Sequence, residues 1–143
     1  MVAHIVALME HPEHVAEVTS FFESAGYKVC IVDSFAKAKA ILQMRSFDLI
    51  ISDVHLENGG SVFDFLKWVR STKRLQETPF VLFSIDPSAI AKYLADAVHT
   101  CARQLGANRC ISMQTFEPHI LSQEIAELLP ARADIPVRTK EEK

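Results

Sequence analysis

The sequence predicts an α/β fold in which helices cover both faces of a parallel β-sheet. Short apolar runs alternate along the chain with longer stretches whose apolar residues recur at helical spacing. The run DLIIS at residues 48–52 is apolar without alternation, which is typical of a strand buried on both faces. Strands and helices that alternate through short loops form a parallel sheet with right-handed crossovers.

Five strands and five helices follow from this pattern. The strands are predicted at residues 4–9, 28–32, 48–52, 80–84 and 108–112. The helices are predicted to begin at about Pro12, Ser34, Ser61, Asp86 and Pro118. Proline is favourable in the first turn of a helix, and serine caps the free amides of a first turn. Five strands in this alternation fit the flavodoxin-like (βα)5 fold, with the strands in the order 2-1-3-4-5.

The fourth helix is the longest of the five. It is predicted to run from Asp86-Pro87 to about Leu105, where Gly106 ends it. Its apolar residues are expected on one side, packed against the sheet. These residues are Ile90, Leu94, Ala97, Val98 and Cys101.

Length and composition indicate one domain at residues 1–129, followed by a charged, proline-containing tail at 130–143 that is predicted to be disordered. The chain has 143 residues, 49% of them hydrophobic, and a net charge of −3. That charge gives no reason to expect nucleic-acid binding, and no apolar run approaches the ~20 residues that span a membrane.

Cellular location is predicted from two further features. The first residues contain neither the basic region nor the cleavage site of a signal peptide. The three cysteines, Cys30, Cys101 and Cys110, are widely spaced among apolar residues, which predicts reduced, buried thiols and not disulfides or a zinc site. We therefore expect a cytoplasmic protein.

Asp53 is the first candidate for a functional residue. It follows the buried run 48–52 directly and precedes a polar, glycine-bearing loop. In open α/β sheets, ligands bind outside the carboxyl ends of the strands. The sequence therefore predicts a functional site at this edge, with a reactive carboxylate in it.

The sequence resembles the receiver domain of bacterial two-component response regulators, over about residues 3–129. The resemblance rests on the order of the elements and on the acid within DLIISDVHLENGG. It rests also on the hydroxyl that closes PFVLFS and on Gly106-Ala107 before the last strand. It implies that a histidine kinase or phosphotransfer protein phosphorylates Asp53. It also implies Mg²⁺ bound by Glu10, Asp53 and the backbone carbonyl of His55, and a contact from Ser84 to the phosphoryl group.

Four positions depart from the pattern of that family. Met9 replaces one acid of the metal-binding pair, and Met113 replaces the lysine of the last strand. Gln114 replaces the proline that follows this lysine, and Cys110 replaces the aromatic switch residue. Because fewer hard oxygen ligands are present, we expect Mg²⁺ to bind weakly. A hydrogen bond to a charged group contributes roughly 1.5–3 kcal/mol, so without the lysine we expect phosphorylation to be poorly coupled to a change of shape.

The sequence thus predicts a stand-alone receiver that signals by protein contacts and is not an enzyme. Its long fourth helix is expected to dock a downstream partner or a second copy. The alternative is a pseudo-receiver, which would act as an interaction module without phosphorylation; Met9, Cys110 and Met113 favour it.

A third class of function is a metal- or cobalamin-dependent subunit. His11, His14 and His55 are expected near Glu10 and Asp53, and imidazoles with carboxylates suit a transition metal. The string Asp53-x-His55 also resembles part of the D-x-H-x-x-G motif of cobalamin-binding domains. Here, however, Gly59 comes one residue late and the string follows the third strand instead of the first.

Overall fold

The computed structural model describes residues 2–54, 56, 60–85 and 89–129. Five strands form one parallel sheet in the order β2-β1-β3-β4-β5, which confirms the predicted flavodoxin-like fold. The strands are β1 (His4–Leu8), β2 (Lys28–Val32), β3 (Leu49–Asp53), β4 (Phe80–Ile85) and β5 (Arg109–Met113).

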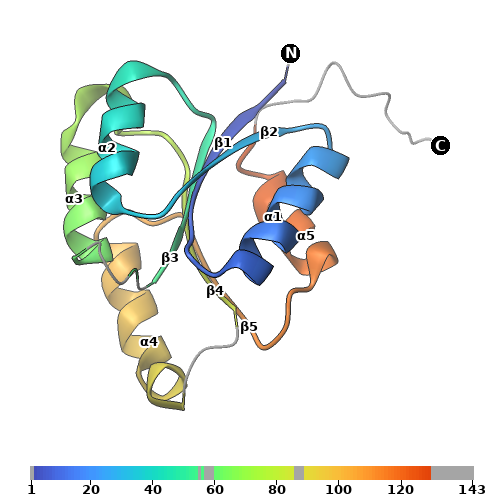
Figure 1. Cartoon of the computed structure of the whole chain (residues 1–143). Coiled ribbons are helices and arrows are strands. Elements are labelled where there is room, and N and C mark those ends of the chain that lie inside the picture. Colours follow the sequence, from blue (N-terminus) through green and yellow to red (C-terminus); the bar gives the residue numbers. More distant parts are fainter. Residues whose placement is uncertain (1, 55, 57–59, 86–88, 130–143) are drawn as a thin grey trace.

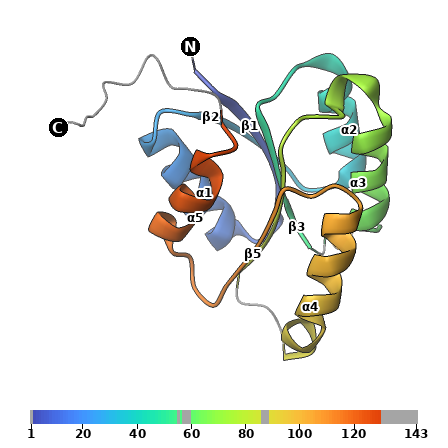
Figure 2. The same cartoon turned by 180° about the vertical axis from the view of Figure 1, so that it is seen from behind.

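The helices cover both faces of this sheet. Helices α1 and α5 lie on one face, and α2, α3 and α4 lie on the other (Figures 1 and 2). Their bounds are α1 (Pro12–Ser24), α2 (Phe35–Met44), α3 (Val62–Ser71), α4 (Ala89–Gln104) and α5 (Pro118–Ala126), with a short 3-10 helix η1 (Lys73–Leu75) after α3. Within the described part of the chain, no helix has the length and apolar character needed to span a membrane.

The helix signals in the sequence act as predicted. The Ser34 hydroxyl accepts the Lys37 amide at 3.1 Å at the start of α2. The Ser61 hydroxyl accepts the amides of Phe63 and Asp64, at 3.1 and 3.4 Å, at the start of α3. Each bond satisfies an amide that has no partner within its own helix.

Two hydrophobic clusters hold the layers together, one on each face of the sheet. The cluster under α2, α3 and α4 contains Phe65 and Phe80, whose ring centroids are 6.0 Å apart. The cluster under α1 and α5 contains Phe22 and Phe83, both fully buried. Alternate residues of each central strand enter opposite clusters, which is why these strands are apolar without alternation.

Helix α4 has 16 residues, against 13 in α1, so the long fourth helix is confirmed. The apolar side assigned to it is partly wrong, because Leu94 and Ala97 are exposed. Figure 1 shows that the start of α4 extends past the end of the sheet. Ala102, in the second half, is fully buried.

Two further predictions need correction. The three cysteines are free, as expected, but each is half-buried, and Cys30 and Cys110 pack at the margin of the cluster under α2, α3 and α4. The strand bounds also shift by one residue: β1 ends at Leu8, β3 and β5 each begin and end one residue later, and β4 extends to Ile85. The Asp86-Pro87 helix start and the tail 130–143 lie outside the described residues.

Arg70 of α3 joins three segments at the amino end of β4. Its guanidinium donates to the Gly106 carbonyl at 2.9 and 3.1 Å, and to the carbonyls of Leu75 and Thr78 at 3.0 and 2.7 Å. It also donates to the side-chain oxygen of Asn108 at 3.0 Å, and that oxygen accepts the Phe80 amide at 2.8 Å. One side chain thereby fixes η1, the start of β4 and the turn before β5.

Candidate functional site

The structure brings three predicted site residues to one edge of the sheet. Glu10 lies two residues after β1, Asp53 is the last residue of β3, and Ser84 is the last residue but one of β4. These strands are neighbours in the order β1-β3-β4, and their pairing is parallel, with Asp53 beside Phe83. A carboxylate, a second carboxylate and a hydroxyl therefore come from three adjacent strands to the edge where α/β folds carry their sites.

Asp53 is half-buried, and Ser52 before it is 1% exposed. The Ser52 hydroxyl donates to the backbone carbonyl of Asp53 at 2.9 Å. This bond satisfies the buried hydroxyl and restrains the peptide on which the candidate acceptor is carried. Ser52 is not among the predicted site residues; the signal for it in the sequence is a small polar residue inside an apolar run.

Met9 and Met113 are both placed inside the protein. Each is 3% exposed, and both belong to the cluster under α1 and α5. The Met113 sulfur accepts the Glu117 amide at 3.2 Å, which ties the end of β5 to the start of α5. These two positions therefore add apolar packing beneath the edge, where the family pattern has a carboxylate and an ammonium group.

Cys110 faces the opposite side of the sheet and packs against the cluster under α4. Its thiol lies 3.8 Å from the His99 carbonyl and donates a weak hydrogen bond to it. Burial raises the pKa of this thiol, against smaller opposing contributions from the charge and hydrogen bonding of Arg103. Gln114, one residue past β5, is exposed.

The raised pKa predicts slow alkylation of Cys110, because the thiolate is the reactive form. In a variant with Cys30→Ser and Cys101→Ser, Cys110 is the remaining thiol. We expect the rate of its alkylation by iodoacetamide to rise with pH, with a midpoint at higher pH than that of a small free thiol. The folded state holds the proton more tightly than the unfolded state, so this group stabilises the fold below its unfolded pKa. That contribution is lost as pH rises through the folded value. A midpoint at the same pH as that of the free thiol, or at a lower pH, contradicts the prediction.

No cluster of three or more His, Cys, Asp or Glu side chains is placed to hold a metal ion among the residues that the structure describes. His11 and His14 lie with their ring centroids 5.4 Å apart in an edge-to-face arrangement. His55, the third imidazole of the transition-metal hypothesis, lies outside the described residues, as does Gly59 of the cobalamin-like string. The described geometry gives neither hypothesis any support.

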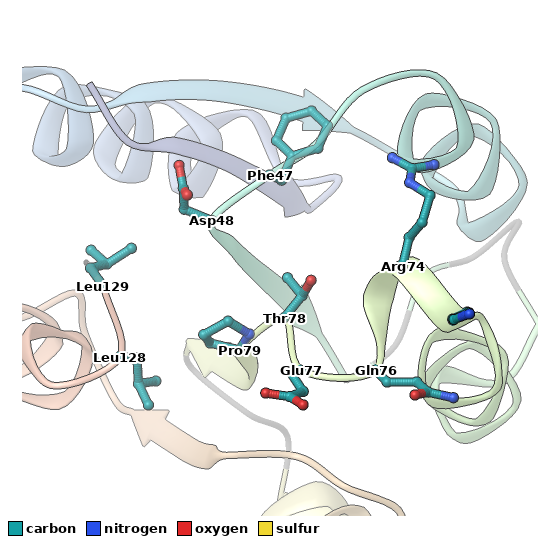
Figure 3. Close-up of a pocket in the computed structure, with 10 residues that line it drawn as sticks. Phe47, Asp48, Arg74, Gln76, Glu77, Thr78, Pro79, Leu128 and Leu129 are labelled. Atoms are coloured by element: carbon teal, nitrogen blue, oxygen red, sulfur yellow. The ribbon is translucent and has the colours of Figure 1, made fainter. Parts of the chain in front are cut away.

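A hollow lies at the amino end of the strands, away from Asp53. It has a volume of about 580 Å³, and Figure 3 shows Leu128 and Leu129 on one side of it and Arg74 on the other. Two of its charged groups are engaged in structural contacts, and the first is the Asp48 carboxylate, which accepts the His4 amide at 2.8 Å. Arg74 donates to the carbonyls of Gln43 and Arg45 at 3.2 and 3.3 Å. These contacts join η1 to the end of α2, and β1 to the residue before β3.

Comparison with known proteins agrees with this geometry. No family model matches the chain. A stretch of 58 residues is 40% identical to the TorCAD operon transcriptional regulatory protein TorR of Escherichia coli; it is 39% of this chain and 25% of that regulator. The chain thus spans about a quarter of the length of this curated relative.

Solved structures match over most of the chain. The chemotaxis response regulator CheY4 of Vibrio cholerae is 26% identical, with 90% of this chain and 100% of that one covered and a TM-score of 0.71. The receiver domain of the sensor histidine kinase PA1611 of Pseudomonas aeruginosa is 15% identical, with 90% and 98% covered and a TM-score of 0.72. A magnesium ion is coordinated in the active-site cleft of that domain. Strand order, the carboxylate that ends β3 and these likenesses agree, and the chain has the fold of the receiver domains of response regulators, which it resembles.

Proposed function

We propose that this receiver domain accepts a phosphoryl group on Asp53 and signals through protein contacts. The observation that carries the proposal is the meeting of Asp53 with Glu10 and Ser84 at the carboxyl edge of three adjacent strands. A histidine kinase or a phosphotransfer protein is the donor that this chemistry implies. The receiver acts as a stand-alone unit in this proposal.

The reaction uses Asp53 as a nucleophile. One carboxylate oxygen attacks the phosphorus atom in line with the bond to the donor; a new P–O bond forms and the donor leaves with the electron pair of the old one. The product is an acyl phosphate on Asp53. In this proposal the Ser84 hydroxyl donates to an oxygen of the bound phosphoryl group.

The residues present fit Mg²⁺, although with few protein ligands. Mg²⁺ prefers oxygen ligands, keeps several of its waters, and is commonly held by one or two carboxylates together with phosphate oxygens. Glu10 and Asp53 supply the two carboxylates in this proposal, and the His55 carbonyl a further oxygen. When bound, the ion offsets the repulsion between the carboxylate and the incoming phosphoryl group. Met9 adds no ligand, because its side chain is buried and a thioether is a poor partner for a hard cation.

A second candidate function is a pseudo-receiver that binds its partner without phosphorylation. The observation that favours it is the burial of Met9 and Met113 in one hydrophobic cluster. No cation at position 113 is available to hold a phosphoryl oxygen, so a charge-assisted hydrogen bond of roughly 1.5–3 kcal/mol is missing. A complete population shift needs about 5.5 kcal/mol of differential stabilisation.

Intact-mass measurement after incubation with Mg²⁺ and a small phosphoryl donor separates the two functions. We expect the wild-type chain to gain one phosphoryl group and Asp53→Asn to gain none. Asp33→Asn is the matched control, because Asp33 directly follows β2 at the same edge and its exposed carboxylate pairs with Lys37 at 2.9 Å. This control should gain the group as the wild type does.

Two outcomes contradict the phosphoacceptor function. The first is no mass gain in wild type when the same donor modifies an ordinary receiver domain in parallel; the pseudo-receiver then becomes the leading function. The second is an equal gain in wild type and Asp53→Asn, which would move the acceptor to another residue.

A further inference from the structure

A cavity of about 210 Å³ lies between α4 and the carboxyl ends of β4 and β5. Leu94, one of the residues that line it, is 46% exposed. Helix α4 is held over the sheet at this level by the contact between the Cys110 thiol and the His99 carbonyl. The described residues that line the cavity are Val54, Ser84, Leu94, Ala95, Val98, His99 and Ser112.

The chemistry of this lining selects against ionised ligands. None of the described lining residues is Asp, Glu, Lys or Arg, the His99 imidazole is the one ionisable side chain among them, and four of the seven are aliphatic. An ion moved from water into such a space loses hydration that no carboxylate, ammonium or guanidinium group replaces. The body of a ligand that binds here is therefore apolar and uncharged.

One end of the cavity carries hydroxyl groups. Ser84 and Ser112 are direct partners in the parallel pairing of β4 with β5. Neighbouring strands lie about 4.8 Å apart, so the two side chains stand next to each other on the same face of the sheet. Each hydroxyl both donates and accepts, and together they suit a single ligand hydroxyl.

The volume limits the ligand to one or two small rings. Pockets for drug-sized molecules measure about 300–1,000 Å³, whereas an apolar cavity of about 150 Å³ binds benzene. A cavity of about 210 Å³ has room for a ring with one polar substituent.

We propose that this cavity binds a small, neutral aromatic molecule that carries a hydroxyl group, with the ring against Val54, Leu94 and Val98 and its hydroxyl at Ser84 and Ser112. This site goes beyond phosphoryl acceptance, because it needs neither Asp53 nor a metal ion. It shares Ser84 with the proposed phosphoryl contact, so a bound ligand acts on the same side chain.

Titration of the unphosphorylated, metal-free full chain with phenol, followed by amide chemical shifts, tests the proposal. We expect phenol at millimolar concentration to shift the amides of Ala95, Val98 and Ser112. Toluene, which has a similar shape without the hydroxyl, should bind several-fold more weakly. Benzoate, which is ionised at neutral pH, should not bind.

Three variants locate the binding. Val98→Phe fills the cavity and should weaken phenol binding at least ten-fold, whereas Tyr93→Ala should leave it unchanged. Tyr93 is on the same helix, is 87% exposed and does not line the cavity. Ser112→Ala should weaken phenol binding about five-fold and leave toluene binding unchanged, which reports the hydroxyl contact even where Val98→Phe disturbs folding.

The proposal is overturned if millimolar phenol shifts none of these amides, or if Val98→Phe and Tyr93→Ala affect binding equally. It is also overturned if toluene binds as well as phenol and Ser112→Ala changes neither. Asp53→Asn should bind phenol as the wild type does. A failure of this proposal is therefore separate from a failure of phosphorylation.

Discussion

Replacement of Arg70 by methionine is expected to lower the free energy of unfolding by about 3 kcal/mol. Methionine retains most of the aliphatic stem and removes every donor of the guanidinium. The carbonyls of Gly106, Leu75 and Thr78 then lose a charge-assisted bond in a half-buried setting. Each such bond contributes roughly 1.5–3 kcal/mol, and water that reaches the exposed side replaces part of the sum. Burial lowers the pKa of the Arg70 guanidinium, but an arginine begins so high that it stays charged at working pH.

Urea unfolding followed by circular dichroism measures this effect, and Arg74→Met is its matched control. Arg74 is exposed and makes two longer bonds, at 3.2 and 3.3 Å, to the carbonyls of Gln43 and Arg45. Its replacement should cost less than about 1 kcal/mol. Equal costs for Arg70→Met and Arg74→Met would mean that the link between η1, β4 and the turn before β5 is not a principal source of stability.

Gly106→Ala is expected to destabilise the fold by about 3 kcal/mol, for two separate reasons. The backbone of Gly106 has φ +112°, a conformation that side chains with a Cβ rarely adopt. A Cβ at this position would lie 2.9 Å from the Cγ and Nε atoms of Arg70, and the five bonds of the guanidinium resist its displacement. The two contributions are of similar size, on the order of 1–2 kcal/mol each.

Gly60→Ala separates these contributions. Gly60 has φ +81°, and an added Cβ would meet no atom within 4 Å. Its replacement by alanine should therefore lower the free energy of unfolding only through the unfavourable backbone conformation, by about 1 kcal/mol. In the double variant Arg70→Met/Gly106→Ala, the methionine can move away from the new methyl group. We therefore expect a total loss below the sum of the single losses, by about 1 kcal/mol. If the loss of stability in the double variant equals the sum of the two single losses, the close approach between the new Cβ and Arg70 does not destabilise the fold.

The sequence by itself determined the architecture. Short continuous apolar runs, apolar residues at helical spacing, Pro12, and the caps Ser34 and Ser61 are local signals, and a local signal needs no knowledge of distant residues. The position of Asp53 could also be predicted from the sequence, because a residue at the end of a buried parallel strand lies at the carboxyl edge of the sheet. Strand bounds moved by one residue, since strand ends are set by the neighbouring strand.

Tertiary structure alone decided what surrounds that edge. The burial of Met9 and Met113 in one cluster joins residues about a hundred positions apart, and no local pattern reports that contact. The exposure of Leu94 and Ala97 depends on where the sheet ends beneath α4, which the helical period cannot reveal. The bonds from Arg70 to the turn at Gly106 and the cavity lined by Ser84 and Ser112 likewise exist only once β4, β5 and the helices are packed. Local propensity sets the elements of this fold, while its specific chemistry arises from non-local packing.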